Sequence, residues 1–123
     1  MKEKILIVED DHLSLKLFEM ALGAKDYYLL KATDGEEALD VATREQPDLI
    51  IMDVRLPDMS GLDVTRKLRA TAAFRHTPII GVTAHAMKGD KEKVIESGCD
   101  AYLSKPISTR ELPEVIAKML ARQ

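Results

Sequence analysis

The sequence predicts an α/β domain in which helices cover both faces of a parallel β-sheet. Five short apolar segments alternate with five amphipathic stretches along the 123 residues, a length typical of one domain. The first, third and fourth apolar segments contain almost no polar residues, as expected for central parallel strands that are buried on both faces. Because right-handed crossovers bring the carboxyl ends of such strands to one edge of the sheet, we expect the ligand site at that edge.

The N-terminal part of the chain contains two predicted strands, each followed by a helix. The apolar segments are "KILIVE" (4–9) and "YYLLKAT" (27–33). The apolar face of the first helix consists of Leu15, Phe18, Ala21 and Leu22. Asp34 is expected to cap the second helix, and Glu37, three residues later, completes a capping-box pattern.

The segment "LIIMD" (49–53) is predicted as the third and central strand. The turn that follows it is built on Pro57, Asp58 and Gly61. Ser60 is expected to cap the next helix, with Asp63 as its reciprocal partner.

The segment "IIGVT" (79–83) is predicted as the fourth strand. A helix is expected from about Met87 to Ser97, where Gly98 stops it. Its inward residues are expected to be Val94 and Ile95.

A short fifth strand, "AYLS" (101–104), precedes the last helix. Ser108 and Glu111 form the expected capping box of that helix. Apolar residues at helical spacing mark its inner face, namely Leu112, Val115, Ile116, Met119 and Leu120.

Composition excludes several classes of protein. The formal net charge is −3 and the Lys and Arg residues are scattered, so we expect no nucleic-acid partner and no membrane partner. The longest apolar run, "LIIM", is too short to span a bilayer, and the N-terminal segment has no signal-peptide core. The single cysteine, Cys99, cannot form an internal disulfide, which fits a reducing, cytoplasmic setting.

Polar residues stand at the carboxyl ends of four of the predicted strands. Each has an ordinary explanation alone: acids favour a helix start, a threonine bonds its own backbone, and a lysine lies on the surface. Their convergence at one sheet edge instead indicates a site. The residues are Glu9 and Asp10 at the end of the first strand, Asp53 at the end of the third, Thr83 at the end of the fourth and Lys105 at the end of the fifth.

This set of side chains suits phosphoryl transfer with Mg²⁺. Neighbouring carboxylates raise one another's pKa unless a cation lies between them, and oxygen ligation by few protein groups suits Mg²⁺. A carboxylate can attack phosphorus to form an aspartyl phosphate, whose oxygens must be neutralised. Asp53, alone on the middle strand, is favoured as nucleophile, with the two acids at positions 9 and 10 as metal ligands. Lys105 and Thr83 are then expected to contact the phosphoryl oxygens.

Four motifs in order and spacing carry a family resemblance: "VEDD", "MDVRLPDMSG", "GVTAHAM" and "YLSKPIS". Over essentially the whole chain, 1–123, the sequence resembles the receiver domain of two-component response regulators. It is most similar to single-domain regulators of the DivK kind and to receivers fused to hybrid histidine kinases. The resemblance implies a doubly wound, flavodoxin-like sheet of five parallel strands in the order 2-1-3-4-5, with helices on both faces.

The resemblance also implies a role for each motif residue. Asp53 is the phosphoacceptor, and its donor is a histidine kinase or a histidine phosphotransfer protein. The implied Mg²⁺ ligands are Asp10, Glu9 through water, Asp53 and the backbone carbonyl of Arg55. Lys105 bonds the phosphoryl group, and the Lys105–Pro106 peptide bond is cis.

The implied switch consists of Thr83, which moves toward the phosphate, and Tyr102, which then turns inward. From the residues alone, the favoured interpretation of Tyr102 is instead a half-buried aromatic of an edge strand. The surface of the fourth helix, fifth strand and fifth helix would change and contact a downstream protein, or pass the phosphate to a histidine. No output domain is expected in this chain, which would act as a monomer or as a weak, phosphorylation-dependent dimer.

Two further positions are expected to tune the lifetime of the phosphate. Arg55 lies two residues after Asp53, and His85 lies two residues after Thr83. In the family these positions flank the path of the hydrolytic water. Neither side chain is an acid or an amide that would position water, so we predict slow self-dephosphorylation.

Other functions remain open at this point. A Mg²⁺-dependent aspartyl-phosphate phosphatase or phosphotransferase shares this chemistry, but it usually carries a second acid where this chain has Arg55. The chain is therefore expected not to be an enzyme beyond catalysing its own phosphorylation and dephosphorylation. A receiver excised from a hybrid histidine kinase is a further alternative. A degenerate receiver would lack one of the site residues, and a flavin carrier would have a phosphate-binding loop after the first strand.

Overall fold

A computed structural model describes residues 2–23, 26–84 and 89–121. Five strands form one parallel sheet in the order β2-β1-β3-β4-β5. This confirms the predicted fold class, including the strand order that the family resemblance implied. The strands are β1 (Glu3–Val8), β2 (Tyr27–Ala32), β3 (Leu49–Asp53), β4 (Ile79–Thr83) and β5 (Ala101–Ser104).

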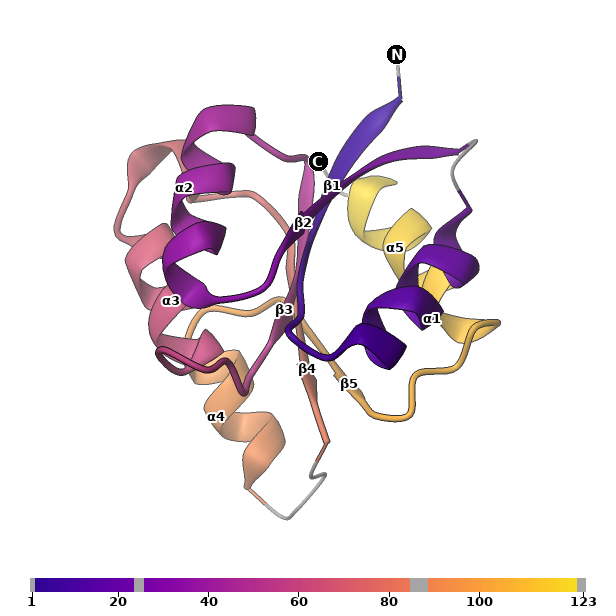
Figure 1. The fold of residues 1–123 in the computed structure, drawn as a ribbon. Coiled ribbons are helices and arrows are strands. Elements are labelled where there is room, and N and C mark those ends of the chain that lie inside the picture. Colours follow the sequence, from indigo (N-terminus) through magenta and orange to yellow (C-terminus); the bar gives the residue numbers. More distant parts are fainter. Residues whose placement is uncertain (1, 24–25, 85–88, 122–123) are drawn as a thin grey trace.

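Helices cover both faces of the sheet. One layer holds α2, α3 and α4, and the other holds α1 and α5 (Figure 1). No described helix combines the length and the apolar composition that crossing a bilayer requires. The helices are α1 (His12–Leu22), α2 (Gly35–Glu45), α3 (Gly61–Arg69), the short 3-10 helix η1 (Ala72–Phe74), α4 (Asp90–Glu96) and α5 (Glu111–Ala121).

The sheet separates two hydrophobic cores because successive side chains of a strand point to opposite faces. Ile5 and Ile7 of β1 pack toward α1 and α5, whereas Leu6 and Val8 pack toward α2 and α3. All four are fully buried, and each such side chain stabilises the fold by about 1.5–3 kcal/mol. Burial on both faces explains why the central strands are almost purely apolar in sequence.

The start of α2 follows the expected cap with one difference. Asp34 is the N-cap, and its carboxylate accepts a hydrogen bond from the Glu37 N–H at 2.7 Å, as predicted. The Glu37 carboxylate, however, accepts from the backbone N–H of Thr33 at 2.6 Å rather than from that of Asp34. The reciprocal bond therefore reaches one residue further back than a capping box requires.

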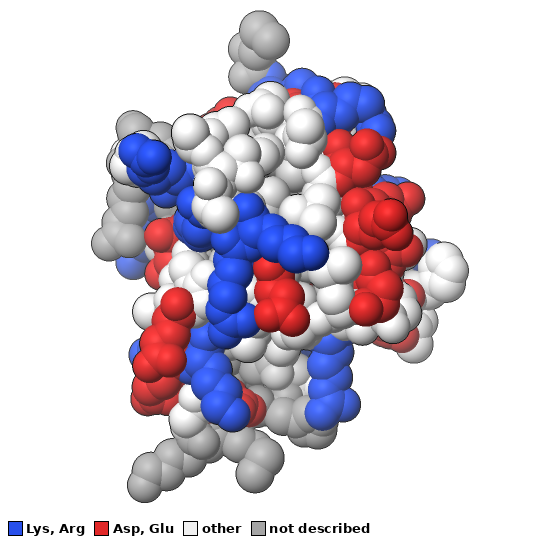
Figure 2. Space-filling model, turned by 90° about the vertical axis from the view of Figure 1, so that its left-hand side faces the viewer, with Lys and Arg blue, Asp and Glu red and all other residues white. Residues whose placement is uncertain are grey.

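The predicted cap of α3 is half right. The Ser60 hydroxyl accepts a hydrogen bond from the Leu62 N–H at 3.1 Å. The expected reciprocal partner, Asp63, instead forms an ion pair with Arg66 at 2.7 Å. Such charges lie side by side over the outer face of α2, α3 and α4 (Figure 2), where exposed pairs add little stability.

The predicted α4 is longer than the observed one. The helix begins at Asp90, after Gly89, and the expected start at Met87 lies outside the described residues. Val94 is buried as predicted, but Ile95 is 41% exposed, so its inward placement was wrong. Adjacent positions on a helix point about 100° apart, and the sheet covers only one of these two.

Candidate functional site

Three carboxylates meet at the carboxyl end of the central strands. Each of Glu9, Asp10 and Asp53 offers an oxygen, and these oxygens all lie within 4.8 Å of one another. The parallel pairing of β1 with β3 sets Val8 beside Met52, so the residues that follow are neighbours as well. Glu9 and Asp53 are buried, with 1% and 4% exposure, whereas Asp10 is exposed to solvent.

A single ammonium group lies between the two buried carboxylates. Lys105 Nζ lies 2.8 Å from Glu9 Oε1 and 3.3 Å from Asp53 Oδ2. The backbone N–H of Lys105 donates to the carbonyl of Thr83 at 2.8 Å, which fixes the segment after β5 against the end of β4. The Lys105–Pro106 peptide bond is cis.

Glu9 occupies an unusual environment for a carboxylate. Its Oε2 accepts a hydrogen bond from the Asp11 N–H at 3.1 Å. Its buried Oε1 lies close to Lys105 Nζ, but the geometry of that contact is not that of a hydrogen bond, and no other described residue donates to Oε1. Burial, which is the largest effect, and the neighbouring Asp53 carboxylate together raise the pKa of Glu9 from 4.5 to about 7, against the opposing effect of Lys105. A buried acceptor in this state suits a site that takes an additional cation.

Lys105 remains a cation in this environment. Burial alone lowers the pKa of the ammonium group, but hydrogen bonds and charge from Glu9 and Asp53 outweigh burial and raise it above its ordinary value. The site therefore keeps one fixed positive charge opposite its acids.

The loop from β3 to α3 folds back beneath Asp53. The Gly61 N–H donates to the Val54 carbonyl at 2.8 Å, and the Arg55 N–H donates to Asp53 Oδ1 at 3.2 Å. Arg55 also pairs with Ser60 in an isolated antiparallel bridge. A Cβ atom on Gly61 would lie 2.0 Å from the Asp53 carbonyl oxygen, so any other residue at this position would force the backbone to shift. The sequence predicts Gly61 only as a turn residue, because this contact exists only in three dimensions.

The predicted site residues line two neighbouring hollows. A hollow of about 260 Å³ is lined by all three carboxylates together with Arg55 and Lys105. Thr83, which is 7% exposed, instead lines an adjacent hollow of about 170 Å³ beside Lys93 of α4. Arg55 borders both hollows and is the link between them. The structure thus gathers the acids and the ammonium in one space and sets the threonine at its margin.

Tyr102 is partly buried on the edge strand β5. It pairs with Gly81 of β4 and packs against the core beneath α2, α3 and α4. Thr83, two residues after Gly81, lies on the same face of β4 as Gly81, because alternate side chains share a face. His85 lies outside the described residues.

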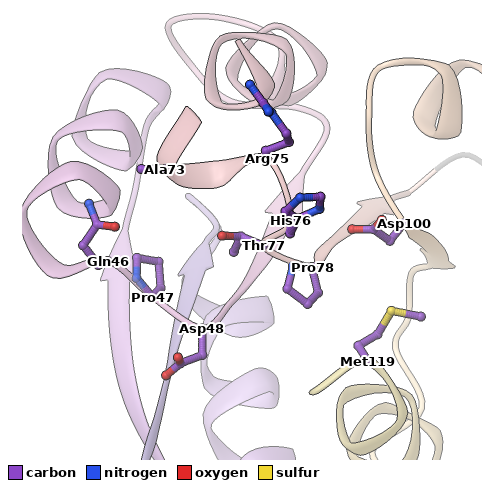
Figure 3. A pocket seen from close by; sticks show the side chains of 10 residues that line it. All are labelled: Gln46, Pro47, Asp48, Ala73, Arg75, His76, Thr77, Pro78, Asp100 and Met119. Carbon is purple, nitrogen blue, oxygen red and sulfur yellow. The ribbon is translucent and has the colours of Figure 1, made fainter. Parts of the chain in front are cut away.

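A larger hollow lies at the opposite edge of the sheet. It measures about 700 Å³ and is lined by ten residues from η1, from the loops before β3, β4 and β5, and from α5 (Figure 3). Its two acids already accept hydrogen bonds: Asp48 from the Lys4 N–H at 2.7 Å, and Asp100 from the Ile79 N–H at 2.9 Å. Size alone therefore does not make this hollow the chemical site.

Comparison with known proteins agrees with the geometry at the acidic edge. Residues 5–117 match the family described as response regulator receiver domain. The polar-differentiation response regulator DivK of Brucella anthropi is 47% identical over 120 residues, which cover 98% of each chain. DivK of Brucella ovis is equally similar, with 47% identity and 98% of each chain covered.

Two solved structures extend the comparison. The receiver domain of a sensor histidine kinase from Pseudomonas aeruginosa PAO1 superimposes with a TM-score of 0.90 at 35% identity, covering 98% of this chain and 99% of that one. That structure holds a magnesium ion in its active-site cleft. A CheY-like receiver domain protein from Methanospirillum hungatei JF-1 gives a TM-score of 0.89 at 30% identity, covering 99% and 96% of the two chains.

Proposed function

Because this chain belongs to the response regulator receiver domain family, we propose that its Asp53 accepts a phosphoryl group from a phosphohistidine of another protein. The chain is a receiver domain of two-component signalling. One observation favours Asp53 as the acceptor. It is the carboxylate that ends the central strand, with Glu9 and Asp10 on one side and the Lys105 ammonium 3.3 Å away. We propose that residues 1–123 form one receiver domain.

The acids fit a magnesium ion. Three carboxylate oxygens within 4.8 Å of one another, one of them on an acid with an unsatisfied buried acceptor, form the oxygen-rich site that Mg²⁺ prefers. We propose Glu9, Asp10, Asp53 and the backbone carbonyl of Arg55 as the groups that would hold it. When bound there, Mg²⁺ supplies positive charge to the oxygens of the transferring phosphoryl group.

The transfer itself exchanges one bond for another. A carboxylate oxygen of Asp53 attacks phosphorus, the P–N bond to the donor imidazole breaks, and its electron pair stays on the imidazole nitrogen. The product is an acyl phosphate on Asp53. Lys105, already 3.3 Å from Asp53 Oδ2, is placed to bind a phosphoryl oxygen and so stabilise the transition state. The catalytic role of the chain is limited to its own phosphorylation and dephosphorylation.

The signal follows from a shift between two conformations. The new phosphoryl charge favours a state in which the Thr83 hydroxyl approaches it and Tyr102 moves toward the space that Thr83 leaves. Both residues face the α4 side of the sheet, so the surface of α4, β5 and α5 changes. We propose that this surface binds a downstream protein in the cytoplasm, with the receiver acting as a monomer or a weak, phosphorylation-dependent dimer.

Intact-mass spectrometry tests the proposed acceptor. The protein is incubated with Mg²⁺ and a small phosphodonor, beside Asp53→Asn as the matched variant that keeps shape but not charge. We expect one phosphate adduct on the parent protein and none on Asp53→Asn. The same adduct on both proteins, or none on the parent, would reject the proposal. Release of phosphate over many turnovers would instead identify a phosphatase.

A further inference from the structure

Helix α2 is capped by a residue that lies outside it, in the loop that follows Asp53. Asp58 Oδ1 accepts a hydrogen bond from the Gly35 N–H at 2.7 Å, and Oδ2 accepts one from the Glu36 N–H at 3.0 Å. The helix also has its own cap, Asp34, which accepts from the next N–H along, that of residue 37, at 2.7 Å. The first N–H groups of a helix need such acceptors, and here two of them are served from a distant segment.

The contact between loop and helix is close as well as polar. A Cβ atom on Gly35 would lie 2.5 Å from Cγ and 2.8 Å from Sδ of Met59, so the loop rests directly on the first turn of α2. The N–H groups of Gly35 and Glu36 lower the pKa of Asp58. The group is therefore a carboxylate at neutral pH, which the N-terminal end of the helix dipole favours.

The same loop carries the proposed metal-binding carbonyl of Arg55. One end of the loop is held at the site, where the Arg55 N–H donates to Asp53 Oδ1 at 3.2 Å. Asp58 holds the other end on α2. Only Leu56 and Pro57 lie between these attachments, and the ring of Pro57 fixes its φ angle. The backbone at Arg55 therefore has little freedom while Asp58 is bound to α2.

We infer that Asp58 is a positioning residue for the metal site: it ties the loop to helix α2 and so holds the Arg55 carbonyl where Mg²⁺ would bind. This inference rests on the proposed function, since it concerns the same ion. The inference also couples α2 to the metal site. If the contact between Asp58 and α2 stabilises the loop conformation that binds Mg²⁺, then bound Mg²⁺ must equally stabilise that contact.

A comparison of two cap variants tests the role of Asp58. Asp58→Ala and Asp34→Ala each remove a carboxylate that caps α2, but only Asp58→Ala releases the loop. Mg²⁺ binding to each full-length protein is measured by titration calorimetry, and stability by thermal unfolding without metal. We expect both variants to melt at lower temperature than the parent. We expect the Mg²⁺ dissociation constant to rise about tenfold for Asp58→Ala, as for other groups that orient metal ligands, and to stay near the parent value for Asp34→Ala.

A conservative variant keeps the test informative if Asp58→Ala does not fold. Asp58→Asn retains one acceptor oxygen and should give a dissociation constant between those of the parent and of Asp58→Ala. Equal Mg²⁺ affinity in the Asp58 variants and the parent would overturn the inference, as would an equal loss in Asp34→Ala. These two outcomes reject only the inference if the parent protein binds Mg²⁺ and forms its phosphate adduct. A parent protein that does neither would reject the proposed function itself.

Discussion

Replacing Gly61 by alanine should disable the site by displacing the backbone of Asp53. The added Cβ would lie 2.0 Å from the Asp53 carbonyl oxygen, about 1.4 Å short of the distance at which ordinary contact begins. The obstacle is backbone rather than a flexible side chain, so either the strand end or the start of α3 must move. Overpacking of this kind costs about 1–3 kcal/mol of stability, and a misplacement near 1 Å at a reacting group slows the reaction about 100-fold.

The rate of phosphate-adduct formation on Gly61→Ala, followed by intact mass in saturating Mg²⁺, measures this effect. Val41→Ala is the matched control, because Val41 is a buried core residue of α2 and its truncation also costs about 1–3 kcal/mol without touching the site. Urea unfolding establishes that both variants are folded under the conditions of the assay. A folded Gly61→Ala that is phosphorylated at the parent rate, or is slowed no more than Val41→Ala, would refute the steric argument.

Three other changes are expected to act on stability and phosphate lifetime. Because the pKa of Glu9 rises from 4.5 to about 7 on folding, the metal-free folded state binds a proton more tightly than the unfolded chain, and stability should fall as pH rises from 4.5 to 7. The fall is at most about 3 kcal/mol, and urea unfolding in a chelator should show it in the parent but not in Glu9→Gln. Arg69→Ala should lose about 2–4 kcal/mol in the same assay, and Arg69→Lys should not restore it, because the guanidinium bonds Asp100 and the carbonyls of Gly98, Phe74 and Thr77. Arg55→Ala should speed the decay of phosphorylated Asp53, and an unchanged decay by intact mass would contradict the shielding role of Arg55.

The strands could be predicted from sequence because their signal is local. The predicted bounds of the third, fourth and fifth strands are those observed, since each is a short apolar run that ends at a polar or turn residue. Their order could not be derived from the runs themselves, because right-handed crossovers allow several arrangements; it came from the family resemblance. The inward face of α4 was harder, because two adjacent apolar residues, Val94 and Ile95, compete for it. Gly81 decides between them, since it leaves on β4 the space that Val94 fills.

The site was predictable to the extent that it follows from the sheet. Acids at the carboxyl ends of β1 and β3 must become neighbours once these strands pair in parallel, and the structure brings them together. The contacts that hold the loop of the site in place leave no comparable pattern in the sequence. Asp58 and its partner N–H groups are more than twenty residues apart, and the turn that contains Asp58 explains its presence equally well. The need for glycine at position 61 depends on a carbonyl oxygen that no sequence pattern locates.

The charges of the site account for the kind of cation it would bind. Glu9, Asp10 and Asp53 together carry three negative charges when ionised, and Lys105 offsets one of them. Without a further cation, burial and the Asp53 carboxylate raise the pKa of Glu9 to about 7, so the site reduces its negative charge by binding a proton. A monovalent ion would still leave a negative site facing an anionic phosphoryl group, whereas a divalent ion brings the formal charge to zero. The acids thus favour a divalent ion for the same reason that the phosphoryl group needs one, because a doubly charged ion removes the repulsion between acceptor and donor.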